Sequence, residues 1–196
     1  VININTGGFL TIASDATLDA TWQSYYTTTI YIPGNWTNNG TFIASTSIVN
    51  FNGTSTVLGS ATTTFNNVEI NGTLTGHATN MNVAGNWTKA NGGTFNHNNG
   101  TVTFTGTGSS TITGETTFKN FTCETGGKTL YFGAGQTQTI AGALTINGSP
   151  GSLIILRKYW GAAFEQWYID PQVQGTRNVS YVDVKDSNNL TLPIIN

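Results

Sequence analysis

The stretch that decides the fold is residues 85–121, GNWTKANGGTFNHNNGTVTFTGTGSSTITGETTFKNF, which repeats the pattern of residues 34–68, GNWTNNGTFIASTSIVNFNGTSTVLGSATTTFNNV. From Gly40 and Gly93 onward, matching residues lie 53 positions apart. The opening Gly-Asn-Trp-Thr motifs at 34 and 85 lie 51 apart, which places a two-residue insertion near 89–92. A fixed period with a small insertion at a polar turn is typical of stacked repeats.

The composition favours a β-rich, turn-rich chain over a disordered one. Only 8% of the 196 residues are charged, but 11% are aromatic and these recur periodically. Thr favours pleated strands, whereas Asn and the 24 Gly favour turns. The net charge of −2, without a cluster of Lys and Arg, argues against nucleic acid as a partner. No apolar run is long enough to span a bilayer, so no membrane span is expected.

Short alternating strands joined by Asn-Gly corners predict an all-β fold, a right-handed parallel β-helix (β-solenoid). In Thr101-Val102-Thr103-Phe104 the alternation directs Val102 and Phe104 inward. A single domain is expected over 1–196, with its internal repeat at 34–68 and 85–121 and an aromatic insertion at 158–168. The lone Cys123 is expected to be a small buried hydrophobe. The predicted core includes Phe51, Phe65, Val83, Val102, Phe104, Phe118 and Ile140.

The repeat length predicts the number of coils. A coil with three short faces needs about 20–27 residues, so the 53-residue unit is interpreted as about two coils. The chain then holds roughly seven or eight coils, and at about 4.8 Å per coil the rod is about 35–40 Å long. In this interpretation Phe51 stacks over the layers that lead to Phe104, and Trp36 and Trp87 repeat in register.

The repeated motifs resemble a known kind of protein. Gly-Asn-Trp-Thr, Gly-Thr-Phe, Val-x-Phe-x-Gly-Thr and Thr-Thr-Phe-x-Asn are similar to the β-strand repeats of large secreted surface proteins of bacteria and archaea, and residues 166–170 and 179–188 resemble the last coils of such regions. The resemblance implies a parallel β-helix at an extracellular or cell-surface location. Residues 158–165 depart from it, because these repeats carry a short polar turn there. The abrupt end at Asn196 is a second departure. Without an initiator Met, the chain is expected to be mature, processed or excised.

The ionisable residues predict no catalytic site, no metal site and no cofactor, so the chain is not expected to be an enzyme. A lyase or hydrolase needs convergent carboxylates, but only Asp183 and Asp186 are close in sequence. Asp183 and Lys185 share the outer face of a predicted strand and are expected to pair there. A weak cation site formed by Asp170, Asp183 and Asp186 is the alternative. Two residues in polar turns lack metal-ligand spacing and are expected to be exposed: His77 and His97.

The aromatic residues form two groups. Trp36, Phe42, Trp87 and Phe95 recur with the repeat, which indicates either an internal aromatic stack or a face that grips sugar rings. The second group falls in the insertion, where it acts as a contact surface or as a local cap. This predicted aromatic contact surface consists of Tyr159, Trp160, Phe164, Trp167 and Tyr168.

Asn-x-Ser/Thr sequences recur along the chain, as expected in a Thr- and Asn-rich composition. They become N-glycan acceptors only if the source glycosylates secreted proteins. Asn147 is the weakest because Pro150 follows its Ser149. The remaining possible acceptors are Asn35, Asn39, Asn52, Asn71, Asn86, Asn99, Asn120, Asn178 and Asn189.

Two functions from different classes follow. The first is a structural surface protein, a filament or stalk subunit whose partner is a further copy of itself, joined head to tail through strand-like termini. The second is a carbohydrate-binding or carbohydrate-active β-helix, an adhesin or a polysaccharide-degrading module, with a surface polysaccharide as partner. The residues predicted at the head-to-tail interface are Val1, Ile2, Ile4, Leu190, Leu192, Ile194 and Ile195.

Overall fold

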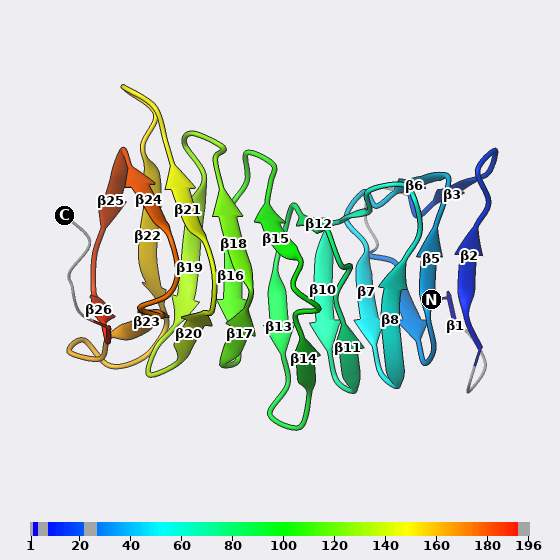
Figure 1. Ribbon diagram of the computed structural model, residues 1–196, viewed down its shortest axis with the longest axis horizontal. Coiled ribbons are helices and arrows are strands. Elements are labelled where there is room, and N and C mark those ends of the chain that lie inside the picture. Colours follow the sequence, from blue (N-terminus) through cyan, green and yellow to red (C-terminus); the bar gives the residue numbers. More distant parts are fainter. Residues whose placement is uncertain (1, 4–7, 22–26, 192–196) are drawn as a thin grey trace.

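The computed structural model describes residues 2–3, 8–21 and 27–191, and within them all regular structure is β-strand. All the strand pairings between its 26 strands are parallel, and the chain stacks them into a β-solenoid of about eight turns. The two ends of the chain lie at opposite ends of the stack (Figure 1). The prediction of an all-β parallel solenoid of seven or eight coils is confirmed.

Each coil contributes one strand to each of three faces. Face one is a continuous nine-stranded sheet: β1 (Ile2–Asn3), β4 (Thr29–Ile32), β7 (Ile48–Phe51), β10 (Asn67–Ile70), β13 (Trp87–Lys89), β16 (Ser110–Thr113), β19 (Thr129–Gly133), β22 (Ile154–Tyr159) and β25 (Val182–Val184).

Face two consists of a five-stranded and a four-stranded sheet that adjoin where β14 lies beside β17. Its strands are β2 (Leu10–Ile12), β5 (Trp36–Asn38), β8 (Thr54–Leu58), β11 (Thr73–Thr75) and β14 (Thr94–Asn96), followed by β17 (Thr116–Phe118), β20 (Thr137–Ile140), β23 (Trp167–Pro171) and β26 (Ser187–Asn189).

Face three begins with a two-stranded sheet and continues as a six-stranded one. Its strands are β3 (Thr17–Asp19) and β6 (Thr41–Ile43), followed by β9 (Thr64–Phe65), β12 (Asn80–Val83), β15 (Thr101–Phe104), β18 (Asn120–Cys123), β21 (Leu144–Asn147) and β24 (Arg177–Ser180).

The core is a set of columns that run along the axis. On face one Ile30, Val49, Val68 and Trp87 pair in turn at a spacing of 19 residues, and all four are buried. The alternation of the strands produces this, because every second side chain points into the coil. Cys123 is buried, as predicted. The seven predicted core residues are also buried: Phe51, Phe65, Val83, Val102, Phe104, Phe118 and Ile140.

The interpretation of the 53-residue unit as about two coils is wrong. Its copies are displaced by eight strands, so β5 corresponds to β13 and β7 to β15, and with three strands per coil this is two and two-thirds turns. Phe51 therefore lies on face one and Phe104 on face three, and they do not stack. The reason is that the coils between the two copies are as short as 19 residues, and 53 residues contain no whole number of them.

What the repeat conserves is a local aromatic cluster rather than a column. Trp36 packs against Phe42 and Phe65 with ring centroids 4.7 and 5.2 Å away. The second copy repeats this geometry, because Trp87 lies 4.8 Å from Phe95 and 5.4 Å from Phe118. Both tryptophans are fully buried, so the internal aromatic packing is confirmed and neither tryptophan can grip a sugar ring.

A matched hydrogen bond anchors each tryptophan. Trp36 Nε1 donates to Thr63 Oγ1 and Trp87 Nε1 donates to Thr116 Oγ1, both at 3.2 Å. Asn38 Nδ2 also donates to Thr63 Oγ1, at 3.2 Å. Thr63 therefore accepts from two buried donors, whereas Thr116 accepts from one.

This difference predicts unequal costs for the same substitution. Thr63→Val leaves two buried donors without an acceptor and is expected to lower the free energy of unfolding by about 2–4 kcal/mol. Thr116→Val leaves one such donor and is expected to cost about 1–2 kcal/mol. Urea denaturation of both variants measures this, and an equal or larger cost at Thr116 would contradict it.

Candidate assembly surfaces

The strands at both ends of the solenoid have an unpaired edge within the described residues. β25, β26 and β24 are the outermost strands of their sheets at one end, and β1, β2 and β3 are outermost at the other. Ile2 lies in β1, opposite Ile30, and Leu190 is exposed just after β26. The other residues predicted at the interface fall outside the described residues: Val1, Ile4, Leu192, Ile194 and Ile195.

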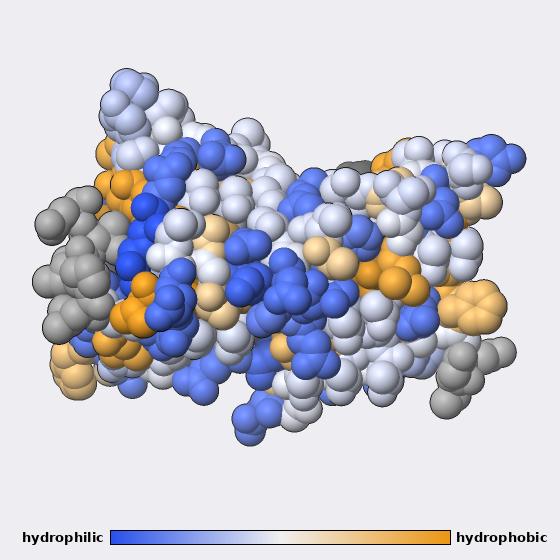
Figure 2. Space-filling view, viewed as in Figure 1, coloured by the Kyte–Doolittle hydropathy of each residue, from blue (hydrophilic) through white to orange (hydrophobic). Residues whose placement is uncertain are grey.

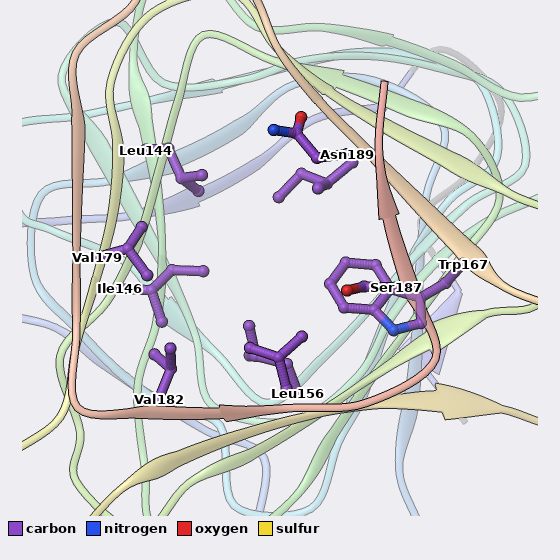
Figure 3. A pocket seen from close by; sticks show the side chains of 10 residues that line it. Leu144, Ile146, Leu156, Trp167, Val179, Val182, Ser187 and Asn189 are labelled. Atoms are coloured by element: carbon purple, nitrogen blue, oxygen red, sulfur yellow. The ribbon is translucent and has the colours of Figure 1, made fainter. Parts of the chain in front are cut away.

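An apolar cavity of about 290 Å³ opens in the middle of the last coils. Figure 3 shows its lining side chains directed toward a common centre, with Leu144, Ile146 and Val179 on one side and Trp167 opposite. Val182 and Val184 of β25 point inward as the alternation predicts, yet 45% of Val184 remains exposed. In the middle of the stack the next coil buries such positions; here, among the described residues, none does.

The predicted aromatic contact surface is divided by the structure. Trp160 is 78% and Phe164 is 90% exposed, Tyr159 is exposed and Tyr168 is half-buried. Trp167 is buried and does not belong to this surface. It is the first residue of β23, where the alternation of the strand directs it into the core.

Trp167 instead forms part of the core below the end cavity. Its ring stacks on Phe132 with centroids 4.2 Å apart and planes 12° from parallel. Its Nε1 donates to the carbonyl oxygen of Lys185 in the last coil, at 3.0 Å. The sequence carried a signal for this, since Trp167-Tyr168-Ile169 begins a run with strand alternation.

The exposed aromatic residues sit on a loop that is held by hydrogen bonds. Lys158 Nζ donates to the Ala162 carbonyl oxygen at 2.5 Å, and Ala162 N donates to Glu165 Oε2 at 2.8 Å. The backbone of Trp160 adopts a positive φ of 55°, an uncommon conformation for a bulky residue. We name residues 159–165 the aromatic loop. Its local contacts fix the loop and leave Trp160 and Phe164 directed away from the core.

The surface carboxylates do not converge. Asp183 forms an ion pair with Arg157, with Oδ2 2.6 Å from Nη2, and not with Lys185 as predicted. The register explains the difference, because Arg157 and Asp183 lie on neighbouring strands β22 and β25. The hydrogen bond from Arg157, together with its charge, lowers the pKa of Asp183.

The alternative cation site is not assembled either. Asp170 accepts a hydrogen bond from Gln172 Nε2 at 2.6 Å and lies on face two, away from Asp183 on face one. In the part of the chain that the structure describes, no group of three His, Cys, Asp or Glu side chains is placed to hold a metal ion.

The histidines are half-buried rather than exposed, which corrects the prediction. His77 Nε2 lies 3.0 Å from the Gly59 carbonyl oxygen and its Nδ1 accepts from Thr79 N at 3.2 Å. His97 Nδ1 accepts from Asn99 N at 3.1 Å. Burial, followed by the charge of Lys119, lowers the pKa of His97. Both side chains hold turns between faces two and three.

The possible N-glycan acceptors differ in exposure, and several of them join successive coils. Asn35 Oδ1 accepts from Thr56 N at 3.0 Å, and Asn86 Oδ1 accepts from Thr111 N at 2.9 Å. A side-chain amide thus completes the backbone pairing at a corner, which explains why Asn recurs there. Three acceptors are half-buried: Asn39, Asn120 and Asn189. Six are exposed: Asn35, Asn52, Asn71, Asn86, Asn99 and Asn178.

Lys128 is a buried residue that the sequence reasoning missed. Its Nζ donates to three carbonyl oxygens, those of Ala84 at 3.1 Å, Gly106 at 3.3 Å and Gly108 at 2.9 Å. The ammonium group has three N–H donors, and each has a partner. Burial lowers the pKa of Lys128. The side chain fixes the Gly-rich loop between β15 and β16 to the coil before it.

We expect Lys128→Met to lower the free energy of unfolding by about 1–3 kcal/mol at neutral pH, because these loop carbonyls lose their donors. The folded state lowers the pKa of Lys128, so between that pKa and the ordinary lysine value the unfolded chain binds the proton more tightly. Wild-type stability should therefore rise in this alkaline window relative to Lys128→Met. Urea denaturation at several pH values measures this, and parallel curves for the two proteins would contradict it.

Comparison of the chain with protein-family models, curated proteins and solved structures found no match. The resemblance to secreted surface proteins, beyond the solenoid itself, therefore stays a prediction. Within the described residues, the structure contains no helix with the length and apolar character needed to cross a membrane.

Proposed function

We propose that this chain is a structural β-solenoid of an extracellular surface, a filament or stalk subunit that associates head to tail with further copies of itself. The observation that carries this proposal is the last coil, where three unpaired strand edges surround an apolar cavity. The first coil at the opposite end offers the unpaired edges of β1, β2 and β3. A parallel coil added there continues the same hydrogen-bond pattern.

The physics of such an end favours addition of another coil. Unpaired backbone N–H and C=O groups are templates for strand addition, and the cavity gains free energy when its apolar lining leaves water. The contact joins two different surfaces, so it repeats from copy to copy instead of closing as a symmetric dimer does. Figure 2 supports this arrangement, because on the visible face hydrophobic residues gather toward the two ends and hydrophilic ones cover much of the middle.

A charge placed in the cavity mouth tests the proposal. Val184→Lys is expected to weaken association by more than tenfold, because the ammonium group would be buried at the contact without a partner. Leu58→Lys is the matched control, since Leu58 is 41% and Val184 is 45% exposed but Leu58 lies on the side of the stack. Light scattering and electron microscopy over a concentration series measure particle length.

The proposal fails if the unmodified chain stays monomeric at the highest concentrations. It also fails if both lysine variants associate as the unmodified chain does. Thermal unfolding of each variant checks that the fold is retained.

A second candidate function is binding of a surface polysaccharide, and one observation favours it. The base of the aromatic loop adjoins a polar pocket, because Gly135 N donates to the Gln166 carbonyl oxygen at 2.8 Å and Gly135 and Gln136 line that pocket. Glu115 and Lys89 line it as well. An exposed tryptophan beside polar side chains suits a sugar ring.

Trp160→Ala is expected to weaken polysaccharide binding about tenfold if this second function holds. Isothermal titration with soluble bacterial exopolysaccharides measures it, and Phe9→Ala, at the opposite end of the stack, is the control. Equal binding by the two variants would remove the second candidate.

A further inference from the structure

We propose that the aromatic loop of one copy locks the head-to-tail contact by placing Phe164 in a groove at the first coils of the next copy. The groove has a volume of about 630 Å³ and is lined by Phe9, Pro33, Asn35, Asn52 and Thr54, with glycine backbone between them. This inference rests on the proposed head-to-tail assembly and specifies which surfaces meet in it.

The loop and the groove lie on the same edge of the solenoid, at opposite ends. The aromatic loop connects β22 on face one to β23 on face two. The groove follows the connections from β1 to β2, from β4 to β5 and from β7 to β8, which join the same two faces. When a second copy continues the three faces, its groove therefore comes directly above the loop.

The loop is long enough to bridge this contact. Its own coil is the one before the last, so Phe9 of the next copy lies two coil spacings farther along the axis, or about 10 Å. The seven residues between β22 and β23 form an arm of about three residues, which reaches about 10 Å before its side chains are counted. Figure 1 shows this connection extending along the axis to the end of the stack where β26 lies.

The chemistry of the two surfaces is complementary. Phe164 is 90% and Phe9 is 72% exposed, which is unfavourable for both rings in an isolated copy. The groove is open because its corner carries little side-chain bulk. A Cβ atom at Gly53 would lie 2.2 Å from the Pro33 carbonyl oxygen, so only glycine fits there. A phenyl ring suits such a cleft between a proline, a glycine backbone and a second phenyl ring.

The loop is also prepared for contact before association. The hydrogen bonds from Lys158 Nζ and to Glu165 Oε2 hold its backbone, so little conformational freedom is lost when Phe164 docks. Gly161, with a φ of 98°, approaches Ala134 of the preceding coil and fixes the base of the loop. A fixed arm with exposed rings suits docking on a second surface.

Disulfide trapping tests the lock. A chain carrying both Phe9→Cys and Phe164→Cys is expected to form a ladder of covalent oligomers under mild oxidation at concentrations where the chain associates. Native Cys123 does not compete, because it is fully buried and burial raises the pKa of its thiol. The matched control combines Phe9→Cys with Leu153→Cys, since Leu153 is exposed on the same coil but at the corner between faces three and one.

A second variant measures the contribution of the ring. Phe164→Ala is expected to weaken association about tenfold or more without changing thermal unfolding, because Phe164 lies outside the core. Association without preferential cross-linking of the Phe9 and Phe164 positions overturns the lock and leaves the proposed assembly standing. A chain that never associates overturns both. Unchanged association of Phe164→Ala with lost polysaccharide binding assigns the loop to the second candidate function and also overturns the lock.

Discussion

The structure depends on one constraint: each strand must give its backbone hydrogen bonds to the coil before it and the coil after it. A parallel strand has no hairpin partner next to it in sequence, so each coil is completed only by its neighbours. The 19-residue spacing that joins Ile30, Val49 and Val68 expresses this constraint on face one. The same constraint makes the ends different from the middle, because there the required neighbour has to come from elsewhere.

The corners show how side chains complete what the strands leave unpaired. Asn35 and Asn86 supply an amide oxygen to the backbone of the next coil, and Lys128 supplies three donors to loop carbonyls. A buried lysine without a carboxylate partner is uncommon, and its burial is tolerated because each N–H has an acceptor. A chain with 8% charged residues thus uses amides and backbone groups where other proteins use ion pairs.

The sequence predicted the fold class and the inward-facing residues, because alternation in strands such as Thr101–Phe104 depends only on neighbouring positions. It did not predict how the repeat maps onto the coils. The 53-residue offset was visible, but stacking follows the 19-residue spacing of Asn52-Gly53 and Asn71-Gly72, which the longer repeat obscures. The partner of Asp183 was missed for a related reason, since Arg157 becomes its neighbour only through the register of β22 and β25. The aromatic insertion was recognised because it breaks the pattern, but which rings stay outside depends on where β23 begins.

The rotated repeat bears on how the chain uses its surface. Because the copies are displaced by two and two-thirds turns, their aromatic clusters lie at different corners and each occupies its own part of the core. The bulky tryptophans are thereby distributed around the axis instead of accumulating on one face, and the coils can keep a similar cross-section along the stack. A constant cross-section is what lets one end of such a solenoid match the other. The aromatic loop is the exception to this regularity, and it occurs where the described stack ends and a matching surface is needed.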